Sequence, residues 1–463
     1  MSRTLIRNGT VVNADGTLSA DVLVDGEKIA AVTAPGVFTE ADTVIEADGK
    51  YVLPGGIDAH THMEMPFGGT FSADTFFTGT RAAAWGGTTT IIDFAVQAKG
   101  TSLLSTMDKW HEKADGHCAI DYGFHMIVSD VNDQSLKEME TCIDSGVNSF
   151  KMFMAYPGVF YATDGEILRA MQKATETGSM IMMHAENGIA IDELVAQAIA
   201  SGRTDPVEHG YTRPPELEGE ATSRAIQLAR VTGAPLYIVH LSASQALAAV
   251  AEARNTGQNV FAETCPQYLY LSIEDLAKPD FEGSKYVASP PLRPKSHQAD
   301  LWRGLRTNDL SVVSTDHCPF CFKDQKELGV GDFSKIPNGI GGVEHRMELM
   351  YQGVVTGQLS LERWVETCCT TPARMFGMYP RKGIIVPGAD ADVLVWDPNR
   401  QTTIGIDDKH HMNMDYSAYE GFVVDGKVDT VLSRGTVVIE DDAYVGRKGH
   451  GRFIARELSQ YLV

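Results

Sequence analysis

The sequence predicts an α/β fold in which a (β/α)8 barrel, or TIM barrel, is joined to a β-sandwich built from the two ends of the chain. Three observations lead to this prediction. The central part alternates eight apolar runs with helical patterns, both ends are rich in Val and Ile between turn signals, and polar side chains follow several central runs. Strand–helix units in series are typical of this barrel. The rival class is an open doubly wound sheet, which would carry a glycine-rich phosphate-binding turn after its first strand; this sequence has none there.

The first 50 residues have the pattern of β-hairpins. Asn8-Gly9, Asp25-Gly26 and Asp48-Gly49 are strong turn signals between runs rich in Val and Ile. The same pattern returns near the end, in GADADVLVWDP and GFVVDGKVDTVLSRGTVVIED. We therefore expect the two ends to form one sandwich with the barrel inserted between them. The expected divisions are sandwich segments at 1–54 and 386–440, the barrel at 55–385 and a C-terminal tail at 441–463.

The eight barrel strands are expected where short apolar runs end in a turn or polar signal. They are predicted at 51–60, 88–95, 119–128, 149–155, 179–184, 235–240, 259–264 and 310–315. A helix is expected between the fourth and fifth strands. Thr163 and Glu166 have the spacing of a capping box, Ile167 and Met171 lie on one apolar face, and Gly178 ends the helix.

Six polar side chains lie in or at the ends of these predicted strands: His60, His62, Lys151, His184, His240 and Asp316. In a (β/α)8 barrel the carboxyl ends of the strands form the face that carries the chemistry. His60 and His62 are two residues apart, so both side chains face one way, and paired imidazoles are natural zinc ligands. Each histidine alone is more often a hydrogen-bonded core residue than a ligand. Their joint placement at one end of the barrel favours a metal centre.

Lys151 lies in SFKMFMAYPG, a run that is otherwise apolar or small as far as Tyr156. Burying a lone ammonium is costly, and a protonated lysine does not ligate a metal. Addition of CO2 to the neutral amine gives a carbamate with two anionic oxygens, and burial near cations favours that neutral form. We therefore interpret Lys151 as a carboxylated lysine that bridges two metals. The alternatives are a lysine that extends to the barrel rim and one paired with a buried carboxylate.

Composition and charge narrow the class of partner and the compartment. The net charge of −22 argues against nucleic acid or an anionic membrane as a partner. No run approaches twenty apolar residues, and the first residues have no signal-peptide core. Seven scattered cysteines, an odd number, indicate reduced thiols rather than a disulfide framework. These observations predict a cytoplasmic protein.

Long motifs in a fixed order now give a resemblance. They are GGIDAHTHMEMPFGGT, WGGTTTIIDFA, SFKMFMAYPG, HAENG, VHLSA, ETCPQYL, ASPPLRP, STDHCPF and GADADVLVWDP. With these motifs the chain resembles the cyclic amidohydrolases of the amidohydrolase superfamily, and within them the dihydropyrimidinase and D-hydantoinase group. The likeness covers nearly the whole chain. It implies a hydrolase that opens the ring of 5,6-dihydropyrimidines or 5-monosubstituted hydantoins to N-carbamoyl amino acids.

The resemblance also implies a role for each matching position. His60 and His62 would hold the more buried of two zinc ions per subunit, and His184 and His240 the more exposed one. Lys151, as carbamate, and a hydroxide would bridge the ions, while Asp316 would bind the buried ion and act as general base and acid. His317 is expected to support Asp316.

The resemblance extends to the substrate side and to assembly. Tyr156 would bind the substrate and its developing oxyanion, and the backbone at Ser289 and Asn338 would hold the ring amide. Segments near 63–70 and 153–161 would contact the ring substituent. The tail at 441–463 would pack on a neighbouring subunit of a homotetramer, against the alternative of a frayed terminus.

Other functions remain open at this point. A dihydroorotase would carry an arginine two residues after the second histidine, where this chain has Glu64. The segment MEMPFGGT of this chain departs from the pattern of the allantoinases. A non-catalytic scaffold relative would have lost metal ligands, whereas all six positions are intact here. The sequence leaves open whether a dihydropyrimidine or a hydantoin is the substrate.

Overall fold

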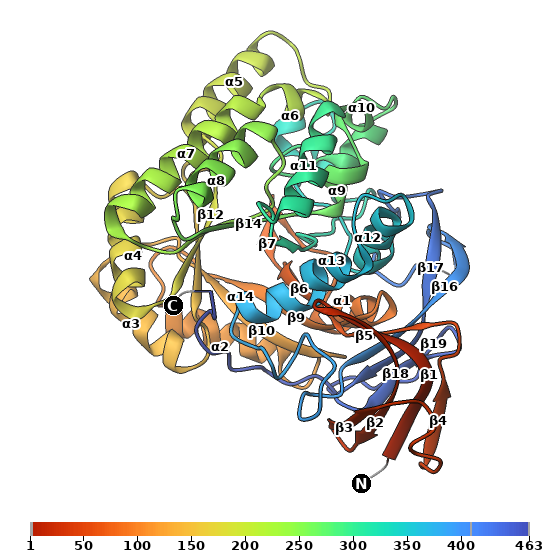
Figure 1. The fold of residues 1–463 in the computed structure, drawn as a ribbon. Coiled ribbons are helices and arrows are strands. Elements are labelled where there is room, and N and C mark those ends of the chain that lie inside the picture. The colour runs from red at the N-terminus through yellow and green to blue at the C-terminus, as the bar shows by residue number, and fades with distance from the viewer. Residues whose placement is uncertain (1–2, 408–409, 462–463) are drawn as a thin grey trace.

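Eight parallel strands form the barrel in the computed structural model, which describes residues 3–407 and 410–461 (Figure 1). Their order around the barrel follows the chain: β6 (Gly56–Thr61), β9 (Thr88–Val96), β10 (Asp121–Ile127), β11 (Ser149–Phe153), β12 (Met180–His184), β13 (Leu236–Ile238), β14 (Val260–Thr264) and β15 (Val312–Val313). Backbone hydrogen bonds join the end of the first strand and the residue after it to the segment that follows the last strand: His62 N donates to His317 O at 2.8 Å, and His317 N donates to His60 O at 3.3 Å. The predicted barrel is confirmed.

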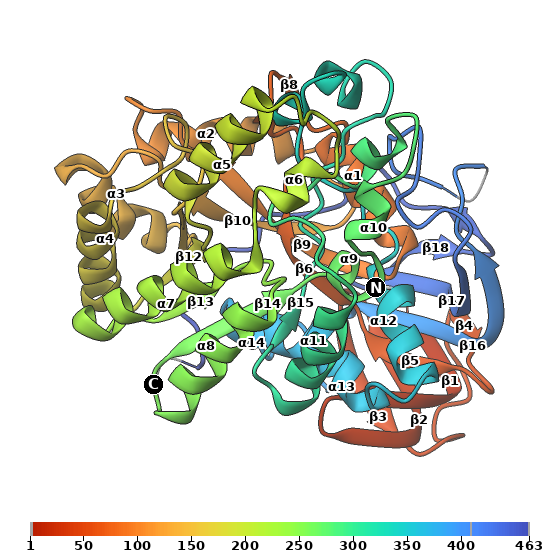
Figure 2. The ribbon, with the colours of Figure 1, turned by 90° about the horizontal axis from the view of Figure 1, so that it is seen from above.

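Helices surround the barrel strands (Figure 2). The longer ones are α1 (Phe76–Trp85), α2 (Leu103–Ala114), α3 (Asp133–Asp144), α4 (Asp164–Thr177), α5 (Gly188–Ala200), α7 (Pro215–Thr232), α8 (Ser244–Asn255), α11 (Ser296–Thr307) and α12 (Arg346–Val355). Shorter ones are α6 (Glu208–Tyr211), α9 (Pro266–Tyr270), α10 (Ile273–Leu276), α13 (Leu361–Val365), α14 (Thr371–Met375), η1 (Glu282–Tyr286), η2 (Lys326–Gly329), η3 (Phe333–Lys335) and η4 (Glu366–Thr370). Helix α4 has the predicted capping box between Thr163 and Glu166, and Gly178 follows it in the left-handed conformation at φ 69°. None of the helices in the described part of the chain is long and apolar enough to cross a membrane.

Nine further strands form the second sheet. They are β1 (Arg3–Asn13), β2 (Gly16–Asp25), β3 (Lys28–Thr33), β4 (Thr43–Glu46), β5 (Tyr51–Pro54), β16 (Val393–Thr403), β17 (Val423–Ser433), β18 (Thr436–Glu440) and β19 (Ala443–Tyr444). Strand β5 joins the two ends of the chain because it pairs parallel with β1 and antiparallel with β16. The expected association of the N- and C-terminal segments is therefore present. A separate small hairpin is formed by β7 (Pro66–Phe67) and β8 (Thr70–Phe71).

One predicted strand was wrong in its extent. The run 51–60 divides into β5, in the nine-stranded sheet, and β6, in the barrel. Gly55 separates them where the chain passes close to β9, since a Cβ on Gly55 would lie 2.2 Å from Thr89 Oγ1. Pro54, Gly55 and Gly56 form a turn signal at this crossing, and the prediction of a single strand overlooked it.

Alternation along the strands fixes which side chains enter the barrel. On β11, Phe150 and Met152 pack outward with the helices, while Phe153 belongs to the cluster inside the barrel. Lys151 shares the inward side because neighbouring residues of a strand face opposite sides. His184 on β12 shares the inward side with Met182 for the same reason.

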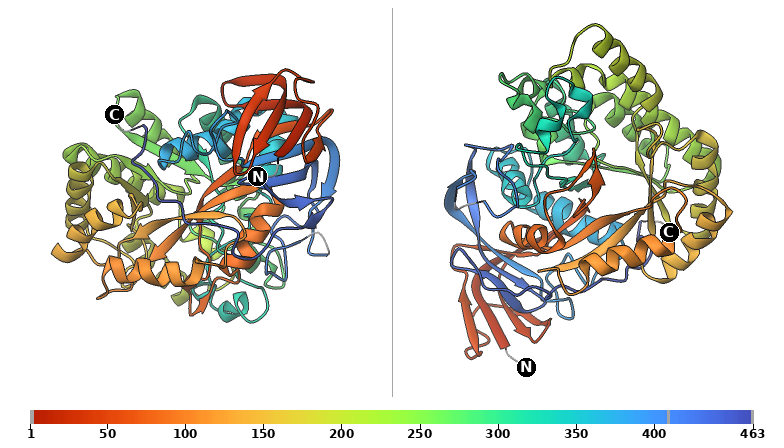
Figure 3. Two further views of the ribbon diagram at one scale, coloured as in Figure 1. Left: turned by 90° about the horizontal axis from the view of Figure 1, so that it is seen from below. Right: turned by 180° about the vertical axis from the view of Figure 1, so that it is seen from behind.

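The C-terminal tail lies against the barrel at the amino ends of its strands (Figure 3). Tyr122 N donates to Arg452 O at 3.1 Å, and Ile454 N returns a hydrogen bond of 2.7 Å to Tyr122 O. Arg456, 4% exposed, donates to Phe124 O on β10. The described part of the tail is therefore held on its own barrel rather than frayed. Its contact with another subunit stays a prediction.

A buried ion-pair network joins the barrel, the sheet and the tail at this end. Lys382, 1% exposed, donates to Asp121 at 2.9 Å and to Asp392, and its amine lies 3.4 Å from Asp390. Arg434 Nε, on the turn after β17, lies 3.0 Å from Asp121. Burial would lower the pKa of Lys382, but the aspartates raise it above the ordinary lysine value. Lys382 is therefore a charged, fully compensated lysine.

Candidate active site

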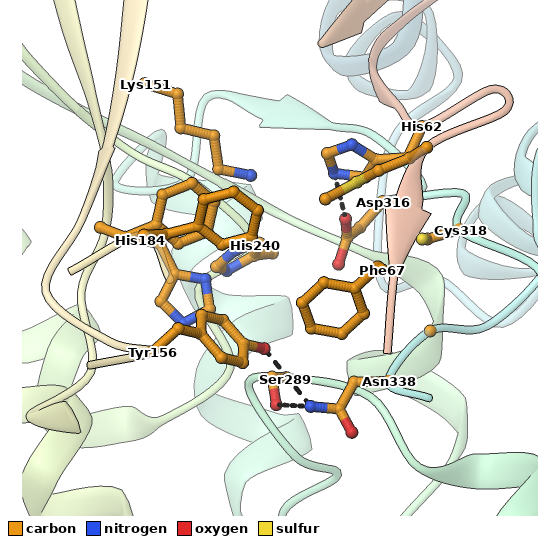
Figure 4. A pocket seen from close by; sticks show the side chains of 14 residues that line it. His62, Phe67, Lys151, Tyr156, His184, His240, Ser289, Asp316, Cys318 and Asn338 are labelled. Atoms are coloured by element: carbon orange, nitrogen blue, oxygen red, sulfur yellow. Dashed lines mark hydrogen bonds and ion pairs between the residues drawn. The ribbon is translucent and has the colours of Figure 1, made fainter. Parts of the chain in front are cut away.

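The predicted residues meet in one cavity at the carboxyl ends of the barrel strands (Figure 4). The cavity together with its opening to solvent encloses about 420 Å³ of space. Its lining includes His62, Lys151, Tyr156, His184, His240, Ser289, Asp316 and Asn338. His60 lies directly behind this lining and is fully buried. The structure thus brings together all nine residues that the sequence predicted for the site.

Four of these side chains form a tight cluster around His60 Nε2. This atom lies 3.2 Å from His62 Nε2, 3.1 Å from Asp316 Oδ1 and 3.0 Å from Lys151 Nζ. His62 Nε2 is also 3.2 Å from Asp316 Oδ1. Ligand bonds of about 2.0 Å in a tetrahedral zinc site give separations of this size between ligand atoms.

Glu263 on β14 orients His60. Its carboxylate accepts from His60 Nδ1, from Tyr237 Oη at 2.9 Å and from the backbone N–H of His240 at 3.1 Å. A histidine that donates one ring N–H to a carboxylate presents its other nitrogen as a ligand. In His60 that other nitrogen is Nε2, the centre of the cluster.

The electrostatics of the cluster favour a cation. Burial lowers the pKa of His62 to about 3, which keeps its imidazole neutral. Burial would raise the pKa of Asp316, but His60 and His62 outweigh it and hold that pKa well below the usual range. Burial and Lys151 act to lower the pKa of His60, yet Glu263 and Asp316 raise it. The Asp316 carboxylate and the neutral imidazole of His62 therefore lie beside His60 Nε2, and this donor set fits a metal ion.

A second pair of imidazoles lies beside the cluster. The rings of His184 and His240 have centroids 4.6 Å apart. His184 Nε2 is 2.8 Å from Glu186 Oε2, so its Nδ1 is the nitrogen left for another ligand. Burial lowers the pKa of His240 far below the ordinary value, and its Nδ1 has no hydrogen-bond partner among the described residues. One ligand atom each from His60, His240 and Asp316 lie within 4.8 Å of one another.

Lys151 has an apolar environment inside this cavity. It is 2% exposed, and its amine lies 4.3 Å from the ring centre of Phe94 and 5.0 Å from that of Phe153. Among residues 3–407 and 410–461 its Nζ makes no ion pair with a carboxylate within 4.0 Å. Burial lowers the pKa of Lys151 to about 8, although Asp316 and Glu263 act in the opposite direction. The lysine therefore neither reaches the barrel rim nor has a direct carboxylate partner, which removes both alternatives for its role.

Hydrogen-bonding groups face the cluster across the cavity. Asn338 Nδ2 donates to Ser289 Oγ at 3.2 Å and to Tyr156 Oη at 3.4 Å (Figure 4). Burial raises the pKa of Tyr156 to about 12, so its hydroxyl keeps its proton at neutral pH. This proton is available to a bound oxygen atom.

An aromatic wall completes the cavity. Phe67 lies 5.4 Å from Tyr156 between ring centres, and Phe160 stacks on Phe153 at 4.9 Å. Met65 adds a further apolar side chain. These residues come from the segments that were expected to contact a ring substituent. The site can therefore hold a small polar ring with an apolar attachment.

Left-handed backbone conformations place three of the side chains. Tyr156, His240 and Asp316 have φ values of 60°, 38° and 51°. Such values are uncommon for residues other than glycine and gather at functional sites. Each lies just beyond a barrel strand, where the conformation turns its side chain into the cavity.

Two features of the site differ from the sequence analysis or were missed by it. Glu263 was missed, although it lies in a predicted strand and begins the motif ETCPQYL. The expectation for His317 was wrong: its Nε2 pairs with Asp74 at 3.1 Å, and its Nδ1 accepts from Gly342 N. His317 thus supports the neighbouring loops and not the carboxylate of Asp316.

Comparison with known proteins agrees with this geometry. The model of the amidohydrolase family matches residues 51–438. The chain therefore belongs to the amidohydrolase family. Within that family its relatives include D-hydantoinases. The one from Streptomyces coelicolor is 64% identical and the alignment covers 100% of this chain and 99% of the relative; that from Geobacillus stearothermophilus is 49% identical over 98% and 96%.

Solved structures give the same result. The dihydropyrimidinase from Brevibacillus agri has a TM-score of 0.97 and 52% identity, with 99% of each chain covered. An L-hydantoinase from Arthrobacter aurescens has a TM-score of 0.88 and 32% identity over 98% of this chain and 100% of its own. The likeness to the dihydropyrimidinase and D-hydantoinase group is thus confirmed along the whole chain.

Proposed function

We propose that this protein hydrolyses cyclic amides, with 5-monosubstituted hydantoins preferred over 5,6-dihydropyrimidines, and releases N-carbamoyl amino acids. The observation that carries the proposal is the cavity itself, in which a cation-attracting cluster faces a hydrogen-bonding set and an aromatic wall. The D-hydantoinases among its relatives support the same substrate class.

The donor set fits two zinc ions. His60, His62 and Asp316 would hold one, His184 and His240 the other, and Lys151 as carbamate would bind both. When bound, two such ions supply Lewis acidity and lower the pKa of a water molecule from 15.7 to about 7. The apolar surroundings of Lys151 favour the neutral amine that carbamate formation requires.

The side chains of the protein would then move the protons and hold the substrate. Asp316, kept ionised by its low pKa, accepts a proton from the attacking water and delivers it to the ring nitrogen as the C–N bond breaks. The Tyr156 hydroxyl donates to the amide oxygen as negative charge develops on it. The backbone at Ser289 and Asn338 holds the ring amide.

The aromatic wall favours an apolar substituent on the substrate ring over a polar one. Phe67, Phe153 and Phe160 match an aryl or alkyl group on the hydantoin ring better than the polar ureido group of allantoin. Among the described residues that line the cavity, Lys151 is the one cationic side chain, and it lies in the cluster. A dihydroorotate carboxylate would therefore lack a dedicated partner.

A substrate panel tests the proposal. The zinc-loaded protein is incubated side by side with dihydrouracil, dihydrothymine, hydantoin, phenylhydantoin, allantoin and dihydroorotate, and ring opening is followed for each. We expect phenylhydantoin to be opened with the highest kcat/KM, and metal analysis to give about two zinc ions per chain, as for two-metal sites. Faster opening of allantoin or dihydroorotate would overturn the substrate class. A chain that binds no metal and opens no ring would indicate a scaffold protein.

A further inference from the structure

Lys326 is a fully buried lysine outside the metal cluster. It is the first residue of η2, and its amine donates to three backbone carbonyls: Val287 at 2.9 Å, Pro337 at 2.7 Å and Gly339 at 2.9 Å. An ammonium group has three N–H donors, so all of them are satisfied. Within the described residues its Nζ makes no ion pair within 4.0 Å.

The three carbonyls belong to the two segments that carry the amide-holding residues. Val287 lies two residues before Ser289, and Pro337 and Gly339 flank Asn338. A backbone hydrogen bond from Gly339 N to Val287 O, 2.9 Å long, also joins the segments. Lys326 therefore bonds to both sides of this clasp, which is defined here as residues 287–289 and 337–339.

The three hydrogen bonds of Lys326 stabilise these segments and do not merely fill the space between them. Burial lowers the pKa of Lys326 to about 7. The three carbonyls oppose that shift, because a neutral amine has only two N–H bonds to donate. Removal of the amine would leave buried carbonyls without a partner, and each such group is costly. The clasp would then relax at the place where the ring amide binds.

We propose that Lys326 is a positioning residue that sets the spacing between the Ser289 and Asn338 segments and so determines affinity for the cyclic amide. The inference rests on the proposed function in taking a ring amide as the ligand of the clasp. Lys326 itself lies behind the clasp and does not line the cavity. It acts through the backbone of the two segments.

Kinetics should show this role as a change in binding. The amide contacts exist both in the bound substrate and in the transition state, and losing such contacts raises KM while kcat changes little. We expect Lys326→Met to raise KM about 10–100-fold, by analogy with the loss of a partner that orients a metal ligand. Because the clasp holds the ring and not its substituent, the factor should be equal for hydantoin and phenylhydantoin.

The experiment compares Lys326→Met, Lys326→Gln and the control Lys382→Met in the zinc-loaded protein. The glutamine amide keeps two N–H donors, so Lys326→Gln should recover part of the affinity. Lys382→Met removes another buried lysine, far from the clasp, and should lower stability with KM unchanged. An unchanged KM in Lys326→Met, or a loss confined to stability as in the control, would overturn the proposal.

Hydrogen exchange gives a readout that does not require turnover. In Lys326→Met, peptides covering 284–290 and 333–341 should exchange faster than in the wild type while the barrel strands keep their protection. In Lys382→Met these two peptides should stay protected relative to the rest of the chain. If the wild type opens none of the cyclic amides, the proposed function fails, and faster exchange confined to the two peptides still supports the positioning role. Unchanged exchange there overturns it.

Discussion

Lys151 and Lys382 are two buried lysines at opposite ends of the barrel, and they differ in whether a carboxylate lies beside the amine. Lys382, where the tail meets the amino ends of the strands, lies among Asp121, Asp390 and Asp392, which raise its pKa. Lys151, inside the strand β11, has aromatic rings and an imidazole as its nearest neighbours, and burial lowers its pKa to about 8. Burial alone therefore does not decide what a lysine does. Direct carboxylate partners keep a buried lysine a charged structural group, and their lack lowers its pKa so that the neutral, reactive amine is more accessible.

The largest effect is expected at Lys151. Lys151→Ala should lose bound metal and ring opening together, because no other side chain at this position can bind both metals. Activity should fall by more than about 10–100-fold, the loss typical when a residue that only orients a metal ligand is removed. Metal content and kcat are measured on the same preparation.

Short carboxylic acids give the matching control for Lys151→Ala. Added acetate or propionate should restore part of the metal content and activity by replacing the carbamate oxygens. A variant that retained two metals and normal turnover without additives would contradict the bridging role and remove the contrast with Lys382.

Lys382→Met tests the other side of the comparison. Breaking a buried ion pair by removing one partner costs about 3–5 kcal/mol because charges remain buried without compensation. We expect the free energy of unfolding to fall by that amount, while kcat and KM of the folded fraction stay at wild-type values. Denaturant unfolding and kinetics at low temperature measure the two quantities. Loss of metal in this variant would show that the two ends of the barrel are not independent.

Tyr156→Phe separates chemistry from packing at the reactive end. Loss of one oxyanion donor typically lowers kcat by about 10²–10³-fold. Metal content and thermal stability should barely change, because the ring still packs against Phe67 and His184. A tyrosine with a packing role only would give the reverse pattern, with stability lowered by about 1 kcal/mol and turnover preserved.

The smallest effect is a pH dependence at the structural end. Burial would raise the pKa values of Asp121 and Asp390, but Lys382 and other partners hold both below the ordinary 3.8. The stability they contribute is thus present above about pH 4 and is lost as the pH falls through the lowered values. Lys382→Met removes the main lowering interaction, so its acid unfolding should begin at a higher pH.

Much of this site could be predicted because strand periodicity and strand ends are visible in a sequence. Lys151 and His184 follow apolar runs at positions whose neighbours face outward, so their inward direction could be inferred. The contacts of Glu263 and Lys326 could not, because they depend on backbone and side-chain atoms from distant segments. The division of 51–60 could have been predicted, since Pro54, Gly55 and Gly56 give a turn signal where the chain passes from one sheet into the other.

The nine-stranded sheet joins strands from the first 54 residues to strands that begin at residue 393, and this has a consequence for the order of events during synthesis. Asn13 and Ile385, 372 residues apart in sequence, exchange two hydrogen bonds. At about 5–20 residues per second, roughly 20–75 s pass between the emergence of the one and the other from the ribosome. Throughout that interval β5 has an unpaired edge where β16 will later bind, and open strand edges are sites of aggregation. We therefore expect the first strands of the nascent chain to be prone to aggregation until β16 has been made.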